Sequence, residues 1–116
     1  MLEYLNLKIG GFYCGTKETQ ISVTDGIVHV DVKDLFDPAA QKSYSLSEAA
    51  SAEWLNALEV LRINLWRSNF TPPGPILDGE QWEMDYKVLG KRCRHFHGDN
   101  AYPENWSAFL SVIDSL

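Results

Sequence analysis

A cysteine and two histidines alternate along one short segment, Cys93-x-His95-x-His97. On a β-strand, alternate side chains point to the same face, roughly 6–7 Å apart from one to the next. A thiolate and two imidazoles are good zinc ligands, and Asp99 or His29 could supply a fourth. Histidines also occur simply as solvated side chains on a polar hairpin. We therefore expect no metal site, and keep a zinc site at Cys93, His95 and His97 as the alternative.

Other groups of polar residues offer less chemistry. Asp31 and Asp34, like Asp78 and Glu80, lie close in sequence, but no pattern sets a general acid opposite a base. The chain has no Gly-x-x-x-x-Gly-Lys phosphate loop, no Gly-x-Ser-x-Gly nucleophile elbow and no His-Glu-x-x-His zinc motif. The sequence therefore predicts a non-enzymatic protein that uses no cofactor.

The aromatic residues point instead to binding. Three tryptophans lie on patterned segments and are expected in the core: Trp54, Trp82 and Trp106. The fourth stands beside a proline-rich segment and could contribute to an exposed aromatic surface for a partner, formed by Trp66, Arg67, Phe70 and Tyr102. Such a surface could also stack single-stranded bases, but a net charge of −6 disfavours contact with nucleic acid.

The elements that position these residues begin with three strands. Leu5, Leu7 and Ile9 alternate with polar residues, which is typical of a strand that ends at Gly10-Gly11. Further strands are expected at 19–24 and 27–32, joined by a tight Asp25-Gly26 turn. The first third therefore predicts an antiparallel meander, and residues 33–44 are expected to be irregular.

Two helices follow from apolar periodicity. The first has the stripe Trp54, Leu55, Leu58, Leu61 and Leu65. Ser45 and Glu48 have capping-box spacing, and Ser47 is the alternative N-cap. The second is expected to start at Pro103 and to bury Trp106, Phe109, Leu110 and Ile113. Between the helices, residues 71–75 (Thr-Pro-Pro-Gly-Pro) predict a stiff surface loop.

A hairpin is expected between residues 82 and 97, after an Asp78-Gly79 turn, but its register is open. A two-residue loop puts on one face Trp82, Met84, Tyr86, Cys93, His95 and His97. A three-residue loop brings Phe96 to the Trp82 face instead and turns both histidines outward. One residue of slip moves every side chain to the other face of a sheet, so sequence cannot choose.

Together these elements predict one α+β domain spanning residues 1–116, with an antiparallel sheet of about five strands covered on one face by two helices. The length and the 45% hydrophobic content are those of a single globular domain. No apolar run approaches the roughly 18 residues of a membrane helix, and the N-terminus lacks the features of a signal peptide. The expected location is therefore the cytoplasm.

The C-terminal motifs resemble those of a known group. Trp66, the Asp-Gly-Glu-Gln-Trp segment 78–82 and the Gly-Asp-Asn-Ala-Tyr-Pro-Glu-Asn-Trp segment 98–106 are similar to a loose group of small uncharacterised bacterial proteins. The resemblance covers about the last 70 residues of the sequence. It implies a shared origin and fold but no mechanism. Small acidic proteins of this kind are common in phage and mobile-element genomes, which by analogy suggests inhibitors of host machinery.

The charge gives the leading hypothesis. Residues 1–60 hold nine acids and four bases, whereas residues 61–116 are nearly balanced. We expect an acidic protein-binding module, an inhibitor or adaptor, that docks on a basic nucleic-acid-binding protein. The residues expected to bind it are Asp31, Asp34, Asp37, Trp66, Arg67 and Phe70. No direct nucleic-acid or membrane contact is expected, and the chain would be a monomer or a homodimer. The alternatives are a small-ligand or metal-binding domain built on the C-terminal hairpin, and a structural homodimeric subunit.

Overall fold

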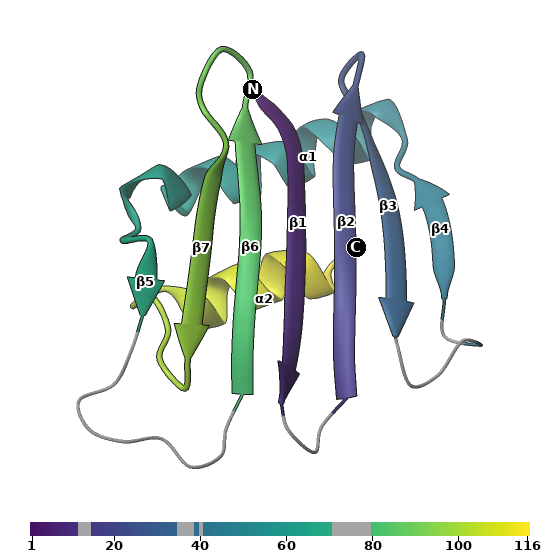
Figure 1. Cartoon of the computed structure of the whole chain (residues 1–116). Coiled ribbons are helices and arrows are strands. Elements are labelled where there is room, and N and C mark those ends of the chain that lie inside the picture. The colour runs from purple at the N-terminus through teal and green to yellow at the C-terminus, as the bar shows by residue number, and fades with distance from the viewer. Residues whose placement is uncertain (12–14, 35–38, 40, 71–79) are drawn as a thin grey trace.

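The structure, a computed structural model, describes residues 1–11, 15–34, 39, 41–70 and 80–116. Within these residues the chain forms an α+β fold with a seven-stranded mixed sheet and two α-helices. The strands are β1 (Leu2–Gly11), β2 (Gly15–Thr24), β3 (Ile27–Asp34), β4 (Lys42–Ser45), β5 (Asn69–Phe70), β6 (Glu80–Val88) and β7 (Arg94–Asp99). The helices are α1 (Glu48–Val60) and α2 (Trp106–Asp114), with a 3-10 helix at Ile63–Leu65. Both α-helices lie on the same side of the sheet (Figure 1).

The sheet has the strand order β4-β3-β2-β1-β6-β7-β5. The expectation of about five antiparallel strands is therefore corrected, because β4 and β5 extend the sheet at its two edges and β5 runs parallel to β7. β4 has four residues and β5 two, which is too short for an alternating pattern to stand out in the sequence. β4 also replaces part of the irregular segment expected at 33–44.

The N-terminal meander is confirmed. β1, β2 and β3 pair antiparallel in sequence order, with Leu5 opposite Ile21 and Ile21 opposite Val30. The turn between β2 and β3 takes a positive φ at Asp25 (52°) and at Gly26 (78°), as a tight hairpin requires. Alternate side chains along these strands are buried under the helices. The side chains between them form what we call the outer face, which no helix in the described ranges covers (Figure 1).

The first helix begins two residues later than a Ser45 cap would place it. Ser47 is the N-cap, and its hydroxyl accepts a hydrogen bond from the Ala50 N–H at 3.1 Å. Ser45 lies in β4 and bonds His29 Nδ1 at 2.6 Å. Of the two caps that the sequence offered, Ser47 is therefore the correct one.

The apolar stripe of this helix is shorter than expected. Trp54 and Leu58 are buried, but Leu65 is 73% exposed. The helix ends at Val60 because Arg62 adopts a left-handed conformation with φ 55°, and the chain then turns into the 3-10 helix. α2 likewise starts at Trp106, not at Pro103, with Asn105 as its N-cap.

The core under the sheet is rich in aromatic rings. Trp82 and Trp106 pack at 4.5 Å between ring centroids, and Trp66 contacts Phe109 edge-on at 5.3 Å. Three of the four indole N–H groups have an acceptor within the protein: Trp54 donates to the Val112 carbonyl, Trp66 to Asn105 Oδ1 and Trp82 to the Ala101 carbonyl, each at 2.9 Å. This pairing lets large amphipathic rings be buried without an unsatisfied donor.

The β6–β7 hairpin takes the second of the two registers. Met84 pairs with Phe96 and Asp85 with His95 across the strands, so the fully buried Phe96 shares a face with Trp82. The connection is longer than either loop considered, because β6 ends at Val88 and β7 begins only at Arg94. Both His95 and His97 consequently project from the outer face.

Candidate functional site

The three aspartates expected to bind a partner do not form one surface. Asp31 lies on the outer face, because it alternates with the buried Val30 and Val32. Asp34, an odd number of positions further along the same strand, lies on the helix side, opposite Lys17 in register. Asp37 lies outside the described residues. Of the three, only Asp31 is therefore placed on an open sheet surface.

Asp31 has an unusual environment. Its Oδ1 atom is buried and has no hydrogen-bond partner among the described residues. The side chain lines a polar hollow of about 450 Å³ on the outer face, together with Asn6, Gln20, His29 and Ser43. A buried acceptor without a donor costs roughly 1–3 kcal/mol, so this oxygen would gain from any donor brought by a partner.

The rest of the outer face is polar and leans towards negative charge. By register, the described strands present five carboxylates there, Glu18, Asp31, Glu83, Asp85 and Asp99. Against these stand three lysines, Lys8, Lys33 and Lys87. All three histidines of the chain, His29, His95 and His97, lie on this face as well.

The histidines of the hairpin are not arranged as metal ligands. His95 Nδ1 lies 2.7 Å from Asp85 Oδ1, and its Nε2 lies 3.8 Å from Glu83 Oε2. Cys93 is exposed in the connection before β7, and its thiol hydrogen bond raises the pKa of the Tyr4 hydroxyl. In the parts of the chain that the structure describes, no three His, Cys, Asp or Glu side chains gather closely enough to hold a metal ion. The geometry therefore gives no support to a zinc site at Cys93, His95 and His97.

The aromatic surface expected around Trp66 is corrected. Trp66 is only 9% exposed and Phe70 only 4%, so neither offers a ring to a partner. Trp66 follows the 3-10 helix and is held under α2 by its hydrogen bond to Asn105. Arg67 is exposed and lies over the Phe70 ring at 4.9 Å, where it covers the core. Tyr102 is the exposed aromatic of the group, and its hydroxyl donates to Glu80 Oε1 at 3.0 Å.

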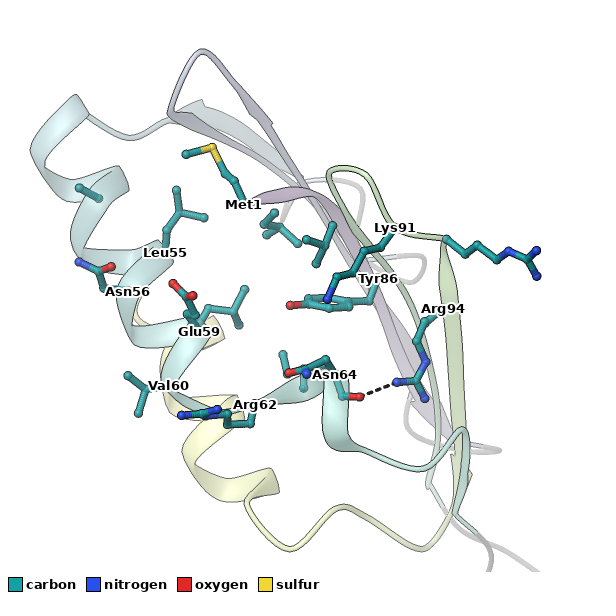
Figure 2. A pocket seen from close by; sticks show the side chains of 16 residues that line it. Met1, Leu55, Asn56, Glu59, Val60, Arg62, Asn64, Tyr86, Lys91 and Arg94 are labelled. Carbon is teal, nitrogen blue, oxygen red and sulfur yellow. Dashed lines mark hydrogen bonds between the residues drawn. The ribbon is translucent and has the colours of Figure 1, made fainter.

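A cleft that the sequence did not indicate opens between α1 and the ends of β1 and β6 (Figure 2). Its volume is about 940 Å³, and its apolar lining includes Leu2, Leu55, Leu58, Ile63 and Val88. Met1 and Val60 also line it and are more than 70% exposed. Clefts of roughly 300–1,000 Å³ with apolar walls and a few charged groups are typical ligand sites.

The charged groups of this cleft are mostly cationic. Arg62, Lys91, Arg92 and Arg94 line it, against the single carboxylate of Glu59. Tyr86 extends its hydroxyl across the cleft towards α1, and Glu59 faces it (Figure 2). Burial first, and the charge of Glu59 second, raise the pKa of the Tyr86 hydroxyl. At neutral pH this phenol is therefore a neutral donor inside the cleft.

Comparison with known proteins adds no template for either surface. No family model and no curated protein matches the chain. Among the described residues, no helix is both long enough and apolar enough to cross a membrane. The functional argument therefore depends on the geometry of the outer face and of the cleft.

Sequence reasoning missed the cleft for a physical reason. Its lining comes from three separate segments, residues 1–2, 52–64 and 86–94, which only the fold brings together. One signal was available: Lys87, Lys91, Arg92 and Arg94 are crowded in an otherwise acidic chain. Three of these four cations line the cleft, whereas Lys87 points to the outer face and bonds Glu3 at 3.1 Å.

Proposed function

We propose that the protein is a non-enzymatic cytoplasmic binding module whose outer face docks on a basic partner protein. The observation that carries this proposal is the buried, unpartnered Oδ1 of Asp31 at the edge of a polar hollow. A lysine or arginine of the partner would supply the missing donor. Charge-assisted hydrogen bonds of this kind are among the stronger ones at interfaces.

The shape and charge of the surface agree with this use. The outer face spans adjacent strands of a seven-stranded sheet and is free of described helices (Figure 1). Its carboxylates outnumber its lysines in a chain whose net charge is −6. Complementary charge steers association, so binding should be fast at low salt and weaken as ionic strength rises. An inhibitor or adaptor of a nucleic-acid-binding protein remains the role that fits best.

The experiment is an affinity pull-down from lysate of the source organism at low and at high salt, with two variants. Asp31→Asn keeps the shape of the side chain but removes its charge. Glu53→Gln, the matched control, makes the same charge change on exposed α1, on the other side of the sheet. We expect one basic partner that is lost at high salt, lost or weakened at least about tenfold by Asp31→Asn, and retained by Glu53→Gln.

Two results contradict the proposal. Either no partner is retained under low salt, or a partner is retained equally by wild type and Asp31→Asn. Light scattering over a concentration series tests the alternative of a homodimer paired through a sheet edge. The edge strands β4 and β5 have only four and two residues, so an edge-to-edge dimer would gain few backbone hydrogen bonds.

A further inference from the structure

The cleft between α1 and the sheet (Figure 2) is a second candidate site, on the helix side of the sheet, whereas Asp31 lies on the outer face. Because the cleft uses other residues on another face of the sheet, a test of ligand binding in the cleft is independent of the test of protein docking on the outer face. Its two features, an apolar lining and a concentration of positive charge, restrict the class of ligand that it can hold.

The positive charge is the first restriction. The chain as a whole has a charge of −6, yet the charged side chains of the cleft sum to a positive value because Glu59 is the only acid among them. Three of its cations, Arg62, Lys91 and Arg92, make no ion pair with a described acidic residue. Because cations outnumber carboxylates in the lining, the cleft favours an anion over a cation.

Arg94 has a different role from these three. Its guanidinium donates to the carbonyls of Asn64 and Trp66 at 2.8 and 2.9 Å, and it stacks on Phe96 at 4.6 Å. These hydrogen bonds connect β7 to the 3-10 helix and to Trp66, and so fix the wall of the cleft that the 3-10 helix forms. Arg94 is therefore a positioning residue, whereas Arg62, Lys91 and Arg92 are the cations free to meet a ligand.

The apolar lining is the second restriction. Leu2, Leu55 and Val88 line the cleft, and Figure 2 shows Leu55 on the α1 wall and Lys91 and Tyr86 on the wall opposite. Polar side chains that could serve a peptide backbone are few, chiefly Asn56, Asn64 and the Tyr86 hydroxyl. β1 and β6 both have neighbours on each side in the sheet, so no strand edge is open to an added peptide strand. An alkyl chain needs no such partners.

From this apolar lining with an excess of cations we propose that the cleft binds a single-chain anionic amphiphile. Its anionic head would lie against Lys91, in the electrostatic field of Arg62 and Arg92, and its alkyl chain would lie along Leu2, Leu55 and Val88. The Tyr86 hydroxyl, which is protonated at neutral pH, can donate a further hydrogen bond to the head. Burial of the chain supplies the affinity, and the cations supply the selectivity for an anion.

The test uses decanoate as the probe, below its micelle concentration, in isothermal titration with the full chain. Decanol and decyltrimethylammonium have the same chain with a neutral or a positive head. The double variant Arg62→Gln/Lys91→Gln removes two cations of the cleft. Its control, Lys17→Gln/Lys42→Gln, makes the same change in net charge at exposed positions on β2 and β4, outside the cleft lining.

We expect saturable binding of decanoate, weaker binding of decanol and none of decyltrimethylammonium. The cleft variant should lower the affinity about tenfold, since each partly exposed ion pair contributes up to about 1 kcal/mol, while the control should change it less than about twofold. Amide shifts in NMR spectra should gather around Leu55, Tyr86 and Val88. Thermal melts of both variants check that folding is intact.

Three outcomes would overturn the inference. Decanoate could produce neither heat nor shifts in the cleft. Decanol could bind as tightly as decanoate, which would mean that the cations recognise nothing. An acidic amphipathic peptide could displace decanoate and bind the cleft more tightly, which would make the cleft a protein-docking site and not a site for a small amphiphile.

Discussion

Replacement of Gly98 by alanine should destabilise this protein more than any ordinary surface change. The Cβ of an alanine at this position would lie 2.7 Å from Trp82 Cε2 and would also meet Trp82 Nε1 and the Ala101 carbonyl. These are the two ends of the buried Trp82–Ala101 hydrogen bond, so the indole has to move and the bond is broken. Overpacking of a core costs about 1–3 kcal/mol and a buried unpaired N–H about another 1–3, which together give a loss of roughly 2–6 kcal/mol.

Urea denaturation followed by far-ultraviolet circular dichroism measures this loss. Gly90→Ala is the matched control, because Gly90 has open space around it but a positive φ of 81°. Its cost is backbone strain alone, roughly 1–2 kcal/mol. Gly98 lacks such a φ, so its cost arises only from crowding. If Gly98→Ala loses no more stability than Gly90→Ala, the close packing of Trp82 on Gly98 does not contribute to stability.

Three further changes test other contacts. Asn105→Ala should cost about 2–4 kcal/mol in the same urea assay, because Asn105 accepts from Trp66 Nε1 and donates to the Leu61 carbonyl, whereas Asn105→Asp, which keeps the acceptor, should cost less. Ser51→Ala should cost about 1–3 kcal/mol of stability and so lower the thermal midpoint, because the buried Ser51 hydroxyl accepts a hydrogen bond from the Val28 N–H. Ser107→Ala, at an exposed position, should leave the midpoint unchanged. Equal midpoints for the two variants would contradict this role of Ser51. Stability should fall as pH rises above about 10, because the pKa of Tyr86 is raised in the folded state and the unfolded tyrosine therefore loses its proton first. Glu59→Gln should lower the pKa of Tyr86, measured by tyrosinate absorbance, and an unchanged titration would remove Glu59 as a cause.

The sequence predicted the elements whose pattern is both long and local. Leu5, Ile21 and Val30 belong to strands of eight to ten residues with one buried face, where period-two alternation has enough length to stand out. Helix α1 was equally clear from Trp54 and Leu58. In these elements, the covering of one face by helices follows directly from the pattern.

The remaining features depend on contacts between distant segments. Trp66 has no periodic neighbours, and the residue that buries and pairs it, Asn105, stands 39 positions later. The register of β6 and β7 depends on a connection that is longer than its Leu89-Gly90 turn signal suggests, so Phe96 could not be placed. The hollow at Asp31 is lined by residues of four strands, β1 to β4. Whether the Asp31 oxygen has a hydrogen-bond partner depends on how these strands pack together. The spacing of residues along one strand therefore cannot predict it.

The position of β1 has a consequence for how the chain is made. β1 is the central strand of the sheet, and one of its edges pairs with β6, from Leu2 opposite Val88 to Gly11 opposite Glu80. β2 and β3 follow β1 directly in the sequence and can pair as soon as they leave the ribosome, whereas β6 begins only at residue 80. Until then the nascent protein holds an unpaired edge beside the apolar side chains of Leu5 and Leu7, a template for pairing with other chains. Synthesis that stops before residue 80 therefore leaves a fragment prone to aggregation, and the described sheet is complete only after β7 has been translated.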